Sequence, residues 1–389
     1  MEDVPPTCMR YLIPDRFQAI VRHARRTNPF YARWIPEGGP VPVLTRRVLQ
    51  DHNDEILNGL KATACTSGST GMPVRVHMPR ERVLDGLRDI AGFIRHMGGP
   101  LPRTDIMRAR SAHPPPEFLA IFTPIPEQLE VLRRNFRERG ATAIITYPSN
   151  AGLLAQEILA TGSDFGFIRR VGMISETVDP GVVETVKRAF PNARIWSSYS
   201  CMEVGLISFQ CPYEPEFHHV VTRKLALEIL DESGKACGLG QPGRVVLTDY
   251  LNRKMPIIRY EIGDLAEFAS CPCGRLPAPA LRNIVGKIRG CLVHRDGRRV
   301  PFMALSVSLR NLPGMRQFQV IQEELERFTV KVVADGPIDD GVRAEFEREF
   351  GYLPRIGIER VDAIPREPSG KFYASICRIG TAERADVPA

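Results

Sequence analysis

Residues 143 to 196 of the chain read AIITYPSNAGLLAQEILATGSDFGFIRRVGMISETVDPGVVETVKRAFPNARIW. Short β-branched runs at 143–147, 167–174 and 194–196 predict strands, and the stretches between them predict helices. Strands that alternate with helices are typical of a largely parallel sheet covered by helices. Beyond a turn at 231–234 the pattern changes to paired strands. We therefore expect an α/β fold for this larger part of the chain.

The two ends of the chain carry their own patterns. Residues 15–31 predict an amphipathic helix that Pro29 brings to an end. Near the other end, 317–322 and 327–333 predict antiparallel strands joined by a Glu-rich turn, and 340–350 predict a helix. This second pattern predicts a small α+β lobe of roughly 100 residues at the C-terminus.

Composition excludes several classes of protein. The chain has 389 residues, 52 Lys and Arg against 45 Asp and Glu, and therefore a net charge of +7. The basic residues are dispersed and form no dense stripe, so we expect an anionic small molecule rather than nucleic acid as the partner. Hydrophobic residues at 43% exclude an intrinsically disordered chain. No apolar run reaches about 18 residues, which predicts no membrane span. The first residues lack the features of a signal peptide, so we expect a cytoplasmic protein.

A glycine- and hydroxyl-rich run, Thr66-Ser67-Gly68-Ser69-Thr70-Gly71-Met72-Pro73, is the most specific local signal. Its glycines let the backbone approach a ligand closely, and its hydroxyls and N–H groups can surround phosphate oxygens. It is not a Walker loop, because no Gly-Lys-Ser/Thr follows the required spacer. The alternative is an ordinary surface turn of the same composition.

Four further segments accompany this run in a fixed order. They are SYSCMEVG at 198–205, RYEIGDL at 259–265, LRNIVGK at 281–287 and PREPSGK at 365–371. Together with the glycine-rich run they resemble the adenylate-forming superfamily of acyl-CoA ligases, and within it the phenylacetate–CoA ligase branch. The resemblance extends over nearly the whole chain.

The resemblance implies a fold and an activity. The fold would comprise a large N-terminal domain of layered parallel sheets and helices at 1–286 and a small mobile α+β C-terminal lobe at 287–389. The activity would be ATP-dependent, AMP-forming activation of a carboxylic acid, aromatic in this branch, as its acyl-adenylate. Transfer to coenzyme A would follow, with Mg²⁺ accompanying ATP. A homodimer is also implied.

The resemblance assigns roles residue by residue. The glycine-rich run would hold the leaving pyrophosphate, Glu203 would bind Mg²⁺, and Asp264 would accept hydrogen bonds from the ribose hydroxyls. Lys371 would neutralise charge on the α-phosphate, and Tyr199 with Ser175 and Glu176 would line the adenine. The implied nucleotide-binding residues are Thr66, Ser67, Gly68, Ser69, Thr70, Gly71, Ser175, Glu176, Tyr199, Ser200 and Asp264, beside the catalytic Lys371 and Glu203. The alternatives are a turn residue for Asp264, a solvated acid at a helix start for Glu203 and a surface lysine for Lys371.

Aromatic residues at two predicted strand ends are candidates for the wall of an acid pocket. Tyr147 ends one strand, and Trp196 precedes the tyrosine motif. Ordinary core packing is the alternative for both residues.

Cysteine spacing predicts a metal site. Cys271 and Cys273 form a C-x-C pair, and Cys211 lies about 60 residues upstream, followed by His218 and His219. Three thiolates and one imidazole would make a closed, structural zinc site. The family resemblance favours His219 over His218 as the fourth ligand. The alternative is a set of reduced cysteines without a metal.

Some positions depart from the family pattern. Met202 stands where a hydroxyl residue is usual, Met72 replaces a common lysine, and Arg289 stands at the usual hinge aspartate. The altered hinge keeps other acceptors open, such as an amine that would give an amide. Activation of a non-carboxylate oxyanion is a further alternative. So is a non-catalytic nucleotide-binding protein built on a decayed ligase fold.

Overall fold

The computed structural model describes residues 10–66, 73–80, 84, 104–106, 119–231, 233–276, 279–285, 291–366 and 372–379. Ser67 to Gly71 of the glycine-rich run, and Lys371, lie outside the described residues. The predicted domain boundary at 286/287 also falls outside them and stays a prediction.

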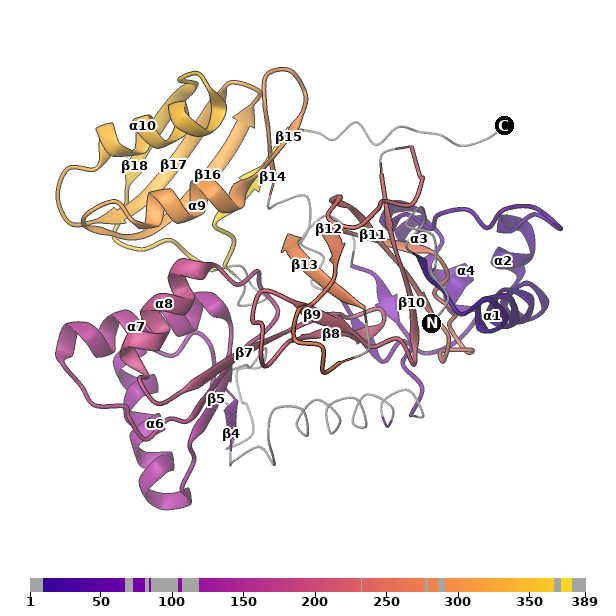
Figure 1. Ribbon diagram of the computed structural model, residues 1–389, viewed down its shortest axis with the longest axis horizontal. Coiled ribbons are helices and arrows are strands. Elements are labelled where there is room, and N and C mark those ends of the chain that lie inside the picture. Colours follow the sequence, from indigo (N-terminus) through magenta and orange to yellow (C-terminus); the bar gives the residue numbers. More distant parts are fainter. Residues whose placement is uncertain are drawn as a thin grey trace.

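A parallel sheet covered by helices forms one end of the N-terminal part, as predicted (Figure 1). Its strands pair in parallel in the order β4-β5-β6-β7. Apolar side chains of strands and helices, among them Ile144, Leu154 and Val171, form one core. The elements are β4 (Thr104–Ile106), α6 (Ile125–Arg139), β5 (Ala143–Thr146), α7 (Pro148–Thr161), β6 (Arg170–Met173), α8 (Pro180–Ala189) and β7 (Arg194–Cys201).

The same sheet continues past β7 with antiparallel strands. The whole is therefore one mixed, 11-stranded sheet in the order β1-β10-β11-β12-β13-β9-β8-β7-β6-β5-β4. The strands on the two sides of the turn at 231–234, β10 and β11, pair antiparallel, which confirms the paired strands predicted there. The antiparallel part begins earlier in the chain than that turn, because β8 and β9 are also antiparallel. The added elements are β1 (Arg10–Tyr11), β8 (Gly205–Gln210), β9 (His218–Val220), β10 (Leu225–Leu230), β11 (Gly243–Asp249), β12 (Tyr260–Ala269) and β13 (Ala280–Val285).

The predicted helix at 15–31 is two helices. The first, α1 (Pro14–Thr27), ends before Asn28, whose side chain accepts a hydrogen bond from the Phe30 N–H at 3.0 Å. Asn28 therefore caps a second helix, and Pro29 begins that helix instead of ending the first. These helices lie beside β10, far from the parallel strands (Figure 1). The remaining short elements here are α2 (Pro29–Trp34), α3 (Arg46–Asp51), α4 (Asn53–Leu57), β2 (Ala64–Cys65) and β3 (Arg75–Val76).

The C-terminal lobe has its own sheet and core, and both predicted strands and the predicted helix are confirmed. Its sheet has the order β18-β17-β16-β19, with β16 and β17 antiparallel. Phe318, Phe328 and Phe346 belong to a separate hydrophobic cluster. In Figure 1 the lobe lies above α7 and α8. Its elements are β14 (Cys291–Val293), β15 (Arg299–Pro301), α9 (Phe302–Arg310), β16 (Met315–Glu324), β17 (Arg327–Ala334), α10 (Asp339–Phe350), β18 (Arg355–Arg360) and β19 (Ser375–Cys377).

Within the described part of the chain, no helix combines the length and apolarity needed to cross a bilayer.

Candidate functional site

One cavity of about 1170 Å³ lies between the N-terminal part and the C-terminal lobe. Its walls include Trp196 and Glu203 from one side and Phe318 and Phe372 from the other. The structure brings the described members of the predicted nucleotide-binding set to this cavity. Those lining residues are Thr66, Ser175, Glu176, Tyr199, Ser200, Glu203 and Asp264.

Glu203 lies in the turn between β7 and β8 and is 3% exposed. Its Oε1 accepts a hydrogen bond from the Tyr260 hydroxyl at 2.8 Å and another from Arg46 Nη1 at 3.1 Å. The buried carboxylate therefore has a fixed orientation and a compensating charge. Sequence reasoning missed both partners. Tyr260 stands inside the quoted 259–265 motif, and Arg46 stands in the stretch Leu44-Thr45-Arg46-Arg47, whose resemblance to the same family implies no role for the arginine.

Tyr199 and Asp264 form a pair between two strands that are not adjacent in the sheet, β7 and β12. The Tyr199 hydroxyl, on β7, donates to Asp264 Oδ2, on β12, at 2.7 Å. Burial raises the pKa of Tyr199 well above its usual value, and the Asp264 charge raises this pKa further. Tyr199 is therefore a protonated donor that orients the aspartate.

Arg46 also connects the carboxylate turn to the start of the glycine-rich run. Arg46 Nη2 donates to Thr66 Oγ1 at 3.1 Å, and the same oxygen accepts from the Val74 N–H at 2.9 Å. The Thr66 and Val74 backbones pair as well, with Thr66 N donating to Val74 O at 2.9 Å. Thr66 and Val74, the residues before and shortly after 67–72, are therefore hydrogen-bonded to each other.

Ser175 and Glu176 follow β6 at its carboxyl end. Ser175 has a left-handed backbone with φ of 69°, which is uncommon for a residue with a Cβ. The Glu176 carboxylate accepts the Ser149 N–H at 3.0 Å and the Phe372 N–H at 2.7 Å. Burial raises the pKa of Glu176, while the Phe372 and Ser149 N–H groups oppose that rise. Glu176 thus bonds to the C-terminal lobe, a contact that sequence reasoning did not foresee.

The predicted acid-pocket residues differ in their positions. Trp196 lines the cavity and packs against Ile145 and Ile174. Its indole lies directly over Gly172, where an added Cβ would come within 2.4 Å of the ring. Tyr147 is 1% exposed and is not among the described residues that line the cavity.

Cys201 lies in the same turn region as Glu203. Burial raises the pKa of its thiol well above the usual value, and the Glu203 charge adds to that rise. A protonated thiol is a poor nucleophile, so the arrangement does not favour covalent catalysis by Cys201.

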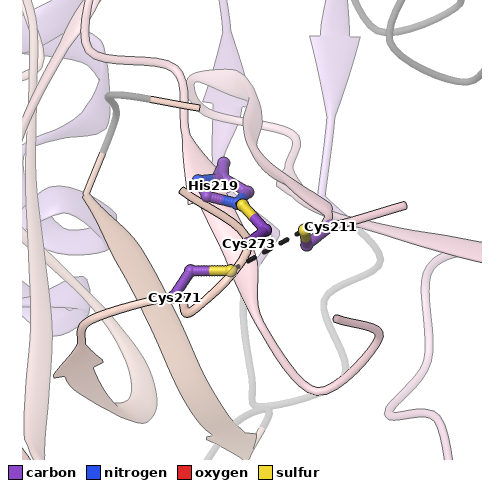
Figure 2. A group of neighbouring side chains, drawn as sticks. All are labelled: Cys211, His219, Cys271 and Cys273. Carbon is purple, nitrogen blue, oxygen red and sulfur yellow. Dashed lines mark hydrogen bonds between the residues drawn. The ribbon is translucent and has the colours of Figure 1, made fainter. Parts of the chain in front are cut away.

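A separate group of side chains could hold a metal ion. Ligand atoms of Cys211, His219, Cys271 and Cys273 all lie within 4.8 Å of one another. Figure 2 shows the four side chains turned toward a common centre. The Cys271 and Cys211 sulfurs are 3.7 Å apart, as are Cys273 Sγ and His219 Nε2. The adjacent His218 points elsewhere, with Nε2 at 3.2 Å from the Ser197 hydroxyl.

Comparisons with known proteins agree with this architecture. A sequence model described as the CapK C-terminal domain matches residues 292–377. No curated protein matches the chain. Among solved structures, 2-hydroxyisobutyryl-CoA ligase in its postadenylation state is 16% identical, with a TM-score of 0.72 over 91% of this chain and 86% of that one.

Two further structures give lower scores. The same ligase in its thioesterification state is 16% identical, with a TM-score of 0.58 over 94% of this chain and 92% of that one. The amide bond synthetase McbA from Marinactinospora thermotolerans is 20% identical, with a TM-score of 0.54 over 74% and 64%. The chain therefore has the fold of adenylate-forming enzymes, with a small C-terminal domain.

Proposed function

We propose that the protein is an AMP-forming ligase that activates a carboxylic acid with ATP. The observation that carries this proposal is the shared cavity, which collects a buried carboxylate, a tyrosine–aspartate pair and the base of a glycine-rich loop. A nucleoside triphosphate needs hydrogen-bond acceptors for its ribose hydroxyls, a ligand for its metal ion and hydrogen-bond donors for its phosphate oxygens, and these groups can supply all three. The likeness in fold to a ligase bound to R3-HIB-AMP supports it.

In the proposed reaction, a carboxylate oxygen of the acid attacks the α-phosphorus of ATP. A bond forms between the carboxylate oxygen and the α-phosphorus. The bond from the α-phosphorus to the oxygen that bridges it to the β-phosphorus breaks, and pyrophosphate leaves with the electron pair of the broken bond. Such a transition state needs its charge spread and neutralised. We assign this task to Lys371 at the α-phosphate and to residues 66–71 at the pyrophosphate.

The nucleoside would be held on the sheet side of the cavity. Asp264 would accept hydrogen bonds from the ribose hydroxyls, and its position is set by the Tyr199 hydroxyl. Tyr199, Ser175 and Ser200 line the same cavity and would contact the nucleotide.

Glu203 suits a magnesium ion that arrives with ATP. Its carboxylate lines the cavity, and its orientation is fixed by Tyr260 and Arg46. Mg²⁺ in nucleotide sites is held by one or two carboxylates, and phosphate and water oxygens supply the other ligands, so a single glutamate is a fitting donor. When bound, the ion would neutralise part of the negative charge of the phosphates.

The acid pocket combines an aromatic ring with aliphatic walls. Trp196, Ile145, Ile174 and Leu206 line the cavity. Apolar walls favour an acid with an apolar, for instance aromatic, body. We propose an aromatic acid and coenzyme A as acceptor, as in the phenylacetate–CoA ligase branch. The likeness in fold to McbA supports an amine acceptor as the second candidate.

We infer that the arrangement of the two domains, which we divide at 286/287, resembles that of a ligase in a postadenylation state. The likeness to the 2-hydroxyisobutyryl-CoA ligase is greater in its postadenylation state, with a TM-score of 0.72, than in its thioesterification state, with 0.58. We infer that the cavity described above is assembled for the first half-reaction.

Exchange of labelled pyrophosphate into ATP with a panel of acids tests the proposal. One acid is expected to support exchange, Lys371→Ala to abolish it, and Lys187→Ala, at an exposed side chain on α8, to leave it unchanged. Product formation with coenzyme A or with amines then identifies the acceptor. ATP binding without any exchange would instead support a non-catalytic nucleotide-binding protein.

We also propose a structural zinc ion at the Cys211, His219, Cys271 and Cys273 cluster. With Zn–S bonds of about 2.3 Å, two sulfurs on a tetrahedral ion lie about 3.8 Å apart. The 3.7 Å between the Cys271 and Cys211 sulfurs fits this separation and is far longer than a disulfide bond. The ion would connect the loop after β8 to the loop after β12. Such reduced cysteines suit the cytoplasm.

Metal analysis of the purified protein tests the zinc site. The wild type is expected to contain one zinc ion per chain, and Cys271→Ser and His219→Ala to lack it. His218→Ala is the matched control and is expected to keep the metal, because that side chain bonds to Ser197. Metal-free wild-type protein would overturn the assignment.

A further inference from the structure

The Glu176 carboxylate joins the two parts of the protein at the cavity that it lines. Oε2 accepts the Ser149 N–H at 3.0 Å, and Oε1 accepts the Phe372 N–H at 2.7 Å. Ser149 belongs to the first turn of α7, and Phe372 belongs to the C-terminal lobe. Each carboxylate oxygen therefore serves a different part of the molecule.

The Ser149 end of this bridge is a helix terminus. The N-cap residue of α7, Tyr147, makes no side-chain capping bond. Glu176, from the end of the neighbouring strand β6, supplies the missing acceptor, and the helix dipole favours a negative charge there. The carboxylate is thus held from the N-terminal part by a bond separate from the one that it makes to the C-terminal lobe.

A second bond fastens the lobe at the same point. Arg366 Nη1 donates to the Ser149 hydroxyl at 2.7 Å, and the Arg366 charge faces Glu176. Arg366 and Phe372 stand immediately before and after residues 367–371, which end with Lys371. The N-terminal part therefore holds both flanks of the segment that contains the proposed adenylation lysine.

We propose that Glu176, together with Ser149, is a positioning residue for adenylation, fastening Arg366 and Phe372 so that Lys371 acts at the α-phosphate. This inference rests on the proposed function. It gives Glu176 a task different from lining adenine: Glu176 acts through the C-terminal lobe, without touching the nucleotide.

Docking of the lobe as a whole has separate support. Ser306 Oγ, on α9, donates to Asp179 Oδ2 at 2.7 Å, and Arg310 Nε lies 3.3 Å from Asp179 Oδ1. Gly181 leaves room for the Arg310 chain, since a Cβ there would come within 2.6 Å of Arg310 Cδ. Loss of the Glu176 bonds should therefore disturb the segment beyond Arg366 without undocking the lobe.

Glu176→Gln tests the proposal, because an amide can accept only one of the two N–H groups and turns its own NH₂ toward the other. Pyrophosphate exchange is expected to lose about 10- to 100-fold in kcat, the range for a lost bond to a charged group. KM values for ATP and acid should stay within about twofold, since no contact to either substrate is removed. Transfer from added acyl-adenylate to the acceptor should keep its wild-type rate.

Ser149→Ala, which removes only the hydroxyl that binds Arg366, is expected to show a smaller loss of kcat in the same assay. Glu130→Gln on α6 is the matched control, since its exposed carboxylate lies away from the cavity lining, and should behave as wild type. A raised KM for ATP with unchanged kcat would overturn the proposal in favour of an adenine contact. Equal losses in both half-reactions would overturn it in favour of a general structural role.

Hydrogen exchange separates this inference from the proposed function. The Phe372 amide is expected to exchange at least about tenfold faster in Glu176→Ala than in the wild type, because this variant removes the acceptor altogether. Unchanged exchange would overturn the inference even if the wild type is an active ligase. Absence of pyrophosphate exchange in the wild type would instead remove the proposed function, and with it the positioning role.

Discussion

Replacing Arg46 with methionine is expected to destabilise the protein through the carboxylate that it leaves behind. Arg46 is 14% and Glu203 4% exposed in their side chains, and Arg46 Nη1 lies 3.1 Å from Glu203 Oε1. Methionine keeps most of the aliphatic volume of arginine but has no charge. The variant therefore confines an uncompensated negative charge beside Tyr260.

The size of the effect follows from this geometry. Removing one partner of a buried ion pair costs about 3–5 kcal/mol. Because Tyr260 still donates to Glu203 at 2.8 Å, we expect the lower end, about 3 kcal/mol. With an unfolding entropy of about 2.1 cal/mol/K per residue, a chain of 389 residues would lose about 4 °C in Tm.

A second variant isolates the charge. Adding Glu203→Gln to Arg46→Met removes the unpaired carboxylate and is expected to restore about 2 kcal/mol. Urea unfolding followed by circular dichroism, with calorimetry for Tm, measures both variants. The reasoning is refuted if Arg46→Met is as stable as the wild type, or if the double variant is no more stable than Arg46→Met alone.

Three further predictions follow from particular contacts. Gly172→Ala should displace the Trp196 indole, costing about 1–3 kcal/mol in urea unfolding and shifting the KM for the acid about tenfold. Tyr199→Phe should raise the KM for ATP about tenfold in pyrophosphate exchange, because Asp264 loses its orienting donor. Asn28→Ala should cost about 2 kcal/mol in urea unfolding, because its side chain caps α2 and donates to two carbonyls of α4.

Each of these has a defined contrary outcome. Gly152→Ala is the control for Gly172, because a Cβ there meets only Val182 at an ordinary 3.7 Å. Equal effects at both glycines would contradict the role given to the indole. An unchanged KM for ATP in Tyr199→Phe would contradict the ribose assignment of Asp264. Wild-type stability of Asn28→Ala would show that water replaces the cap.

Local pattern was sufficient for much of the fold. Periodicity and turn residues predicted β5, β6 and β7 with α7 and α8, and also β16, β17 and α10 of the C-terminal lobe, because each of these signals lies within a few residues. The same logic failed at residues 15–31, where the apolar spacing continues across Asn28 but its side chain begins a new helix. It also gave no strand order, because the partner of each strand is fixed by contacts distant in sequence.

The candidate site divides in the same way. The resemblance of the motifs to a known family marked Tyr199, Glu203 and Asp264, whereas residue type and spacing marked the cysteines of the metal cluster. Only the tertiary structure revealed that Arg46 meets Glu203 across 157 positions of the chain and that Glu176 meets Phe372 across 196. A sequence motif records which groups the chemistry needs. The side chains and N–H groups that neutralise and orient these motif residues can come from any element that packs against them. Which elements pack together is decided by the whole fold.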